Sequence, residues 1–149
     1  MNRFAIAKVT ADMVEAVAPL FDAYRQFYGQ RADYKGALNF LADRLKKNES
    51  VIFLASEGGR SVGFTQLYPS FSSLSMNRIW ILNDLFFDSS ARGHGIGSAL
   101  LDECKRLAVD TGAKELALET MKNNLTAQRL YENQGWKRDE VFYRYYLSV

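Results

Sequence analysis

The spacing of hydrophobic residues changes several times along the chain, and each change predicts a new element. Strands are predicted where apolar residues alternate or are β-branched, and amphipathic helices where they recur every three or four positions. In the first half, Gly58-Gly59 separates two strand-like stretches and is typical of a hairpin turn. The elements predicted there are a strand at 4–9, helices at 13–28 and 34–45, and strands at 51–55 and 61–68.

The second half of the chain alternates strand and helix. Residues 79–87 form a continuous apolar run, typical of a buried central strand, and the glycines of 93–97 lead from it into a helix. The elements predicted here are the strand at 79–87, a helix over 100–108, a short strand at 116–118, a helix at 126–134 and a last, aromatic-rich strand at 141–147. This order predicts one α/β domain with a mixed sheet.

Composition narrows the class of protein. A chain of 149 residues fits one domain, and 48% hydrophobic residues are enough to form a core. A net charge of +2 argues against a protein that coats nucleic acid or an anionic membrane. A single cysteine, Cys104, and a single histidine, His94, exclude a disulfide framework and metal sites built on several of these residues. We therefore expect no metal centre and no nucleic-acid partner.

Segments that direct a chain to a membrane are not recognisable. Lys8 and Asp12 interrupt the N-terminal apolar residues, which are too few for a secretory signal. The longest uncharged run, 61–77, is rich in serine and holds Pro69, so it is not apolar enough to span a bilayer. We expect a cytoplasmic protein with no membrane attachment.

The glycine-rich segment between the central strand and the next helix is the main candidate for chemistry. Glycines let a ligand approach the backbone closely, and the free amides and positive dipole at a helix start attract anions such as a pyrophosphate. Arg92 adds a positive charge at the rim of this loop. A plain tight turn is the alternative interpretation, because turns also require glycine.

Two well-known phosphate-binding loops fit this segment poorly. A Walker loop requires a lysine after its last glycine, whereas Gly97 is followed by Ser98. A dinucleotide fingerprint requires G-x-G-x-x-G, and here the third glycine comes one residue early. Glu119 does lie about twenty residues further on, where that fold places a ribose-binding acid, but four strands would already precede the motif. Dinucleotide binding therefore stays a minor alternative.

Two segments resemble the signatures of a known family. Arg92-Gly93-His94-Gly95-Ile96-Gly97 resembles the R/Q-x-x-G-x-G/A motif of the GCN5-related N-acetyltransferase (GNAT) superfamily. Asn124-Leu125-Thr126-Ala127-Gln128-Arg129-Leu130-Tyr131-Glu132-Asn133-Gln134-Gly135-Trp136 looks like that family's N-x-x-A-x-x-L-Y-E-x-x-G-F segment, with Trp in place of Phe. Residues 81–87 and the aromatic helix around 24–28 look most like the branch that contains polyamine and histone acetyltransferases.

The resemblance implies a single GNAT-like α/β domain over residues 1–149. It implies a mixed central sheet of six to seven strands flanked by about four helices, with the fourth and fifth strands, 79–87 and 116–118, splayed apart. It also implies acetyl-CoA as the acetyl donor and coenzyme A as a product. The residues implied to bind this cofactor are Leu85, Phe86, Phe87, Arg92, Gly93, His94, Gly95, Ile96, Gly97, Ser98, Asn124, Ala127 and Tyr131.

Acetyl transfer to an amine makes three chemical demands. The amine must lose a proton, the carbonyl oxygen must be stabilised, and the leaving thiolate must be protonated. The resemblance places Tyr131 at the thioester sulfur, where its phenol suits the last role, and backbone amides of 85–87 can polarise the carbonyl. Asp84 is the candidate base, directly or through water, because burial in an apolar strand should raise its pKa.

The identity of the base stays open at this point. The family position for a base often carries Glu, and there this chain has Asn83. Neighbouring strand residues face opposite sides, so Asn83 and Asp84 can share one cleft only across a β-bulge. A structural carboxylate is the alternative role for Asp84, and core packing is the alternative for Tyr131.

The acceptor amine is not identified by the sequence. Polyamines, amino acids, small amines and peptide lysines are the candidates, and a non-catalytic acyl-CoA-binding or sensor domain is the alternative function. The spacing of Tyr24, Phe27 and Tyr28 predicts core positions, with one or two ring edges at the acceptor entrance. Aromatic residues on both faces of the last predicted strand favour a homodimer. The candidate substrate-binding residues are Tyr24, Tyr28 and Glu119, and the candidate acidic residues at the entrance are Asp22, Asp33, Asp84 and Glu119.

Overall fold

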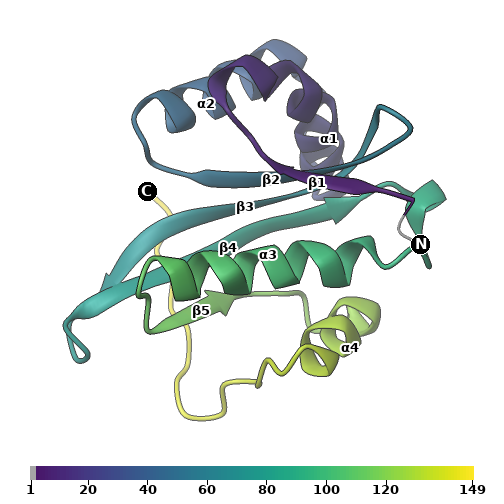
Figure 1. Ribbon diagram of the computed structural model, residues 1–149. Coiled ribbons are helices and arrows are strands. Elements are labelled where there is room, and N and C mark those ends of the chain that lie inside the picture. Colours follow the sequence, from purple (N-terminus) through teal and green to yellow (C-terminus); the bar gives the residue numbers. More distant parts are fainter. Residues whose placement is uncertain (1–2) are drawn as a thin grey trace. The chain divides into compact units, whose positions relative to one another are not determined.

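The computed structural model describes residues 3–149; Met1 and Asn2, at the start of the predicted N-terminal segment, lie outside the described residues. The chain forms two compact units, the first ending at Glu119 and the second covering Thr120–Val149. The main elements are β1 (Ala5–Lys8), α1 (Val14–Phe27), α2 (Tyr34–Lys46), β2 (Val51–Glu57), β3 (Arg60–Ser72), β4 (Asn77–Phe87), α3 (Ile96–Asp110), β5 (Glu115–Leu118) and α4 (Leu125–Asn133) (Figure 1).

The first unit contains a mixed sheet of five strands in the order β1-β2-β3-β4-β5. Neighbouring strands are antiparallel except β4 and β5, which are parallel. The predicted mixed α/β architecture is therefore confirmed, whereas the six to seven strands predicted by the resemblance are wrong for the described residues. The difference lies in 141–147, which has the β-branched and aromatic composition of a strand but is not a strand in the structure. Composition favours strand formation only where a partner satisfies the backbone.

The pairing of β5 covers only part of β4. Partners run from Ile79 opposite Glu115 to Leu82 opposite Leu118, and β5 ends there. Residues 84–87 of β4 pair with β3 alone among the strands of the described chain. Within the first unit, β5 therefore pairs with only the first half of β4, and the splay between these two strands stays a prediction.

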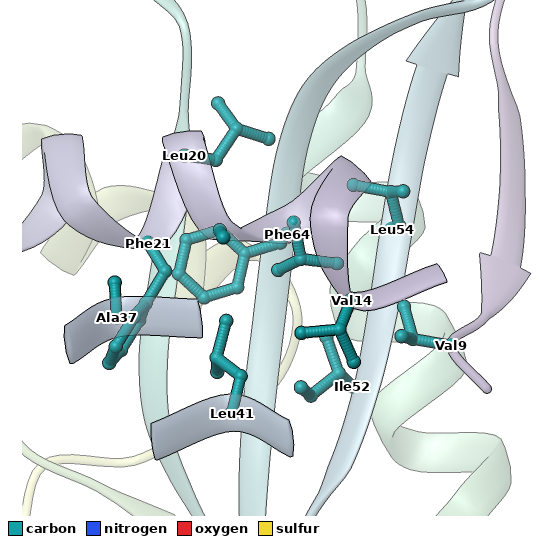
Figure 2. Packing of buried hydrophobic residues seen from close by; sticks show 11 residues of the cluster. Val9, Val14, Leu20, Phe21, Ala37, Leu41, Ile52, Leu54 and Phe64 are labelled. Atoms are coloured by element: carbon teal, nitrogen blue, oxygen red, sulfur yellow. The ribbon is translucent and has the colours of Figure 1, made fainter. Parts of the chain in front are cut away.

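Helices α1 and α2 cover one face of the sheet, and α3 covers the other (Figure 1). The α1–α2 face holds an apolar cluster in which Phe21 and Leu41 of the helices meet Ile52, Leu54 and Phe64 of the strands (Figure 2). Several residues of the apolar stripes that predicted these two helices, such as Val17, Phe21 and Leu41, are buried in this cluster. No helix within residues 3–149 is long and apolar enough to cross a membrane.

The end of α1 differs from the prediction. Tyr24 is half-buried beside the core, as its spacing predicts, but Phe27 is 67% exposed and Tyr28 is 46% exposed. The helix ends at Phe27, and its buried residues lie in the earlier turns, from Val14 to Asp22. Both aromatic rings are consequently available to a ligand and are not core residues.

Candidate active site

A β-bulge in β4 shapes the candidate site. Gln66 of β3 lies opposite Asp84, but the next residue, Leu67, lies opposite Leu82, so Asn83 is an extra residue without a partner. An extra residue reverses the facing of the side chains that follow it. The bulge that the sequence analysis required for Asn83 and Asp84 to share a cleft is therefore present.

The reversal is visible in the contacts on either side of the bulge. Before it, the indole nitrogen of Trp80 donates to Thr111 Oγ1 at 2.9 Å, at the end of α3. After it, Phe86 packs against the cluster beneath α1 and α2. Asp84 has the same facing as Phe86, so the bulge turns its carboxylate toward α1 and α2.

Asp84 is 1% exposed, and both of its carboxylate oxygens accept hydrogen bonds from side-chain amides. Gln66 Nε2 donates to Oδ2 at 2.6 Å, and Asn83 Nδ2 donates to Oδ1 at 2.8 Å. Burial raises the pKa of Asp84 above its ordinary value, while the hydrogen bonds from Gln66, Asn83 and Tyr24 act in the opposite direction. The result is a water-poor carboxylate with a raised proton affinity, which is what a general base requires.

Two tyrosines adjoin this carboxylate. The Tyr24 hydroxyl, from α1, donates to the backbone oxygen of Asn83 at 3.2 Å. Burial, followed by the charge of Asp84, raises the pKa of both Tyr24 and Tyr68 above the ordinary value of a phenol. Both hydroxyls therefore stay protonated at neutral pH, and Tyr24 acts as a hydrogen-bond donor beside Asp84.

An aromatic edge lies beside the same tyrosine. The Tyr24 ring is 5.1 Å from the Tyr28 ring and 6.1 Å from Phe86, and Phe27 is 5.2 Å from Tyr28. Aromatic faces attract organic cations such as an alkylammonium group. The predicted substrate-binding residues Tyr24 and Tyr28 thus form one surface, with Tyr24 connecting it to the Asp84 cluster.

The glycine loop begins five residues after β4 ends. Gly93 and Gly95 have φ of +79° and +80°, and Gly95 is the residue immediately before α3. The first hydrogen bond of α3 runs from the Ala99 amide to the Gly95 oxygen at 3.1 Å, so the preceding amides have no acceptor within the helix. A Cβ at Gly93 or Gly95 would meet no atom within 4 Å, so open space lies over both backbones. This arrangement fits a phosphate group, and the exposed Arg92 adds positive charge.

Contacts with the β2–β3 hairpin hold the segment around this loop. Arg60 Nη1 lies 3.1 Å from Asp88 Oδ2, just before the loop, and His94 Nδ1 lies 3.0 Å from Glu57 Oε1. Gly63 of β3 allows α3 to start close to the sheet, because a Cβ there would lie 3.2 Å from the Ile96 side chain and 2.9 Å from Phe87 Cβ. His94 is thus an anchoring residue of the loop.

The second unit carries the remaining predicted residues. Asn124 precedes α4, and its side-chain oxygen accepts from the Ala127 amide at 3.2 Å, so it caps this helix. Tyr131 lies in the last turn of α4, half-buried, with its ring 6.1 Å from that of Trp136. The second family-like segment therefore folds as a capped helix that presents one tyrosine.

Sequence reasoning found part of this site and missed part of it. It named Asp84, Asn83 and Tyr24, which the structure brings together, and it missed Gln66 and Tyr68. A usable signal existed for Gln66, because a glutamine inside the apolar strand 62–67 must find a polar partner.

Two of the acidic residues suggested for an acceptor entrance have other partners. Asp22 is buried and binds Arg25 Nη1 at 2.9 Å and the Asp33 amide at 3.0 Å. Asp33 caps α2 by accepting from the Gly36 amide at 2.9 Å. These carboxylates stabilise the α1–α2 connection, and Glu119 is exposed directly after β5.

The fold and this site define an α/β protein of the acyltransferase type. Residues 14–136 match the model of the acetyltransferase (GNAT) family. The chain is 52% identical over 134 residues, 90% of each chain, to the uncharacterized N-acetyltransferase YhfO of Bacillus subtilis (strain 168). It is 36% identical to a probable acetyltransferase of Haemophilus influenzae, over 83% of this chain and 84% of that one. A crystal structure of a probable acetyltransferase superposes with a TM-score of 0.92 at 40% identity, covering 97% of both chains.

The chain therefore belongs to the GNAT family of acetyltransferases, and it is an N-acetyltransferase. The family uses acetyl-CoA and acts on amines or peptides. The suspected family is confirmed, while the polyamine and histone branch stays a prediction.

Proposed function

We propose that the protein transfers an acetyl group from acetyl-CoA directly to the primary amine of a small molecule or a peptide lysine, releasing coenzyme A. The observation that carries this proposal is the buried Asp84 carboxylate, held by two amides on the half of β4 that β5 leaves open. A buried carboxylate at this place adds a proton acceptor to an acetyltransferase fold.

The glycine loop would hold the cofactor. The amides from Gly93 to Ser98 and the Arg92 guanidinium would bind its pyrophosphate, and open space over Gly93 and Gly95 supports this fit. No strand within residues 3–149 pairs with Leu85, Phe86 and Phe87 on the β5 side, and their backbone would pair with the pantetheine arm. Asn124, Ala127 and Tyr131 of α4 complete the proposed binding residues.

Asp84 would take the proton from the acceptor amine, directly or through water. An alkylamine with an ordinary pKa near 10 is protonated at neutral pH and must lose a proton before it can attack. Asn83 carries a neutral amide, which cannot accept that proton, so its proposed role is to hold Asp84 Oδ1. The aromatic rings of Tyr24 and Tyr28 would bind the apolar stem or the cationic end of the acceptor.

The other two demands fall to backbone amides and to Tyr131. When bound, acetyl-CoA supplies the activated acetyl thioester. Amides of the open half of β4 would donate to the acetyl oxygen as negative charge develops on it. The Tyr131 hydroxyl would supply the proton that the leaving sulfur requires.

A thiol-release assay over a panel of amines tests this function. The purified chain is incubated with acetyl-CoA and, separately, spermidine, lysine peptides and free amino acids. At least one amine should accelerate thiol release, and Tyr131→Phe should lower turnover far more than acetyl-CoA binding. If acetyl-CoA binds but no amine accelerates thiol release, the proposed enzyme function is contradicted for that panel. Unchanged turnover in Tyr131→Phe would show that Tyr131 does not supply the proton to the leaving sulfur.

We also propose that the protein is a homodimer. The C-terminal segment exposes several large apolar side chains, and such surfaces are typical of subunit interfaces. The exposed residues are Val141, Phe142, Tyr143, Tyr145, Tyr146 and Leu147. Light scattering after size exclusion should give the dimer mass at micromolar concentration, and a monomer would contradict the proposal.

A further inference from the structure

Gln66 is a fully buried polar residue with only one end of its side-chain amide hydrogen-bonded. It is 0% exposed in the middle of β3, directly opposite Asp84. Its Nε2 donates to Asp84 Oδ2 at 2.6 Å, but its Oε1 is buried and has no hydrogen-bond partner among residues 3–149. One end of the side chain is therefore tightly bound to the carboxylate, while the other end is unsatisfied.

The unsatisfied oxygen shows what orients this side chain. If the Gln66 amide were turned by half a rotation, its oxygen would face an ionised carboxylate and repel it. A buried carbonyl without a donor is unfavourable, and an apolar residue of the same length would avoid this loss. The observed orientation is thus the one that favours an ionised Asp84, at the expense of the glutamine's own hydrogen bonding.

We propose that Gln66 is a positioning residue that holds Asp84 in its ionised, proton-accepting form, and that its amide rotates when Asp84 takes up a proton. This inference rests on the proposed role of Asp84 as the base. The N–H bond of the acceptor amine breaks, and an O–H bond forms at Asp84 Oδ2. With its amide rotated, Gln66 Oε1 accepts a hydrogen bond from this new hydroxyl, so the unsatisfied oxygen gains its partner only in the protonated state.

Several other groups act on the same carboxylate or on its neighbours. From α1, Tyr24 faces Asp84, and Tyr28 acts on Tyr24. From β3, Tyr68 faces Asp84, and Arg44 of α2 acts on Tyr68. The raised pKa values of Tyr24 and Tyr68 keep both phenols neutral, so they add no negative charge beside Asp84. Gln66 is the fully buried side chain that donates to its carboxylate.

The experiment compares Gln66→Met with Thr65→Val in the full chain. Methionine keeps the length of the side chain but removes the donor to Asp84 Oδ2. Thr65 is equally buried and also bonds to Asp84, but through the backbone oxygen at 2.8 Å, so it is the matched control. Two readouts are taken: carboxyl carbon-13 NMR titration of Asp84, assigned with Asp84→Asn, and the pH profile of kcat/KM with an acceptor amine.

In Gln66→Met, the titration midpoint of Asp84 and the acidic limb of kcat/KM should both move up by about one pH unit or more. This shift lowers kcat/KM about tenfold below the limb, while the plateau above it stays within about threefold. Thr65→Val should leave both positions unchanged. An unchanged Asp84 midpoint in folded Gln66→Met overturns the inference, as does an equal shift in Thr65→Val.

Two further variants keep the test decisive. If Gln66→Met does not fold, Gln66→Glu replaces it, because a second carboxyl beside Asp84 should raise the midpoint further, and an unchanged midpoint again overturns the inference. If Asp84→Asn retains full activity and its acidic limb, the proposed base role fails. The NMR midpoint then still shows whether Gln66 controls the ionisation of this carboxyl.

Discussion

The two halves of β4 have different surroundings and different chemistry. Residues 77–82 lie between β3 and β5, and their buried side chains, Trp80 and Leu82, face α3. Residues 84–87 pair, among the strands of the described chain, with β3 alone, and the buried side chain there is Asp84, which faces α1 and α2. A single extra residue, Asn83, separates the halves.

This difference shows how one strand can serve both packing and chemistry. Without the bulge, Asp84 would have the facing of Leu82 and would point into the apolar layer beneath α3. Cys104 lies in that layer, where burial raises the pKa of its thiol to about 12, so the layer disfavours charge. On the opposite face, Gln66, Asn83 and Tyr24 supply polar partners, and a carboxylate there can remain ionised.

The largest expected effect is a loss of activity on substituting Asp84, in the second half of β4. Asp84→Asn should lower kcat/KM at neutral pH by about 10²- to 10⁴-fold, the usual contribution of a general base. The fold should survive, because Gln66 can rotate and offer its free Oε1 to the new amide. Thiol release with the best amine of the panel measures the effect, and a loss below threefold would contradict the base assignment.

The effect of Asp84→Asn on stability should depend on pH. Because burial raises the pKa of Asp84 above 3.8, the native state binds a proton more tightly than the unfolded state does. Wild-type stability therefore falls as pH rises above about 4, relative to Asp84→Asn. In urea unfolding, the gain in free energy of unfolding of Asp84→Asn over wild type should be largest at neutral pH and absent below about pH 4. A difference that does not change with pH would show that burial does not raise the pKa of Asp84.

Shortening a buried side chain in the first half of β4 should lower the stability of the protein. Leu82→Ala leaves a cavity beneath α3 and should lower the free energy of unfolding by about 2–5 kcal/mol. The acidic limb of kcat/KM should stay in place in the folded variant, because Leu82 faces away from Asp84. A limb shifted by a full pH unit would show that the two halves are not separate in function.

The glycine loop gives a smaller effect with a matched control. Gly95→Ala forces a side chain into a left-handed conformation, at about 1–2 kcal/mol, and should raise the KM for acetyl-CoA about 5- to 30-fold as the loop rearranges. Gly112 has φ of +68° beyond the far end of α3, so Gly112→Ala should lower stability similarly but leave this KM unchanged. Steady-state kinetics distinguishes them, and equal KM values would remove the loop from cofactor binding.

The smallest expected effect lies at the bulge itself. Asn83→Ala removes the donor to Asp84 Oδ1, but Asn83 is exposed, so water can replace its amide. The acidic limb should therefore move up by only about half a pH unit, less than in Gln66→Met. A larger shift in Asn83→Ala than in Gln66→Met would contradict this prediction, because Asn83 would then affect the pKa of Asp84 more than Gln66 does.

The sequence predicted the parts of this molecule that depend on local spacing. Periodicity predicted α1, α2 and the hairpin of β2 and β3, and the glycines predicted the loop before α3. The strand predicted at 141–147 is wrong, because strand formation depends on residues distant in sequence. The bulge at Asn83 was recognised only as a condition, since it is defined by register against β3. A glutamine in an apolar strand indicates a polar partner, but that Gln66 pairs with Asp84 depends on the same register.

The role of Asp84 as general base is tested most directly by the pH profile of kcat/KM. The profile is measured for wild type and Asp84→Asn with the same acceptor amine, under conditions where both proteins are equally folded. Asp84 on the open half of β4 should produce an acidic limb in wild type, where kcat/KM falls tenfold per pH unit. This limb should be absent from Asp84→Asn, whose residual rate should not fall in that range. A limb of the same slope and position in both proteins would contradict the base role of Asp84.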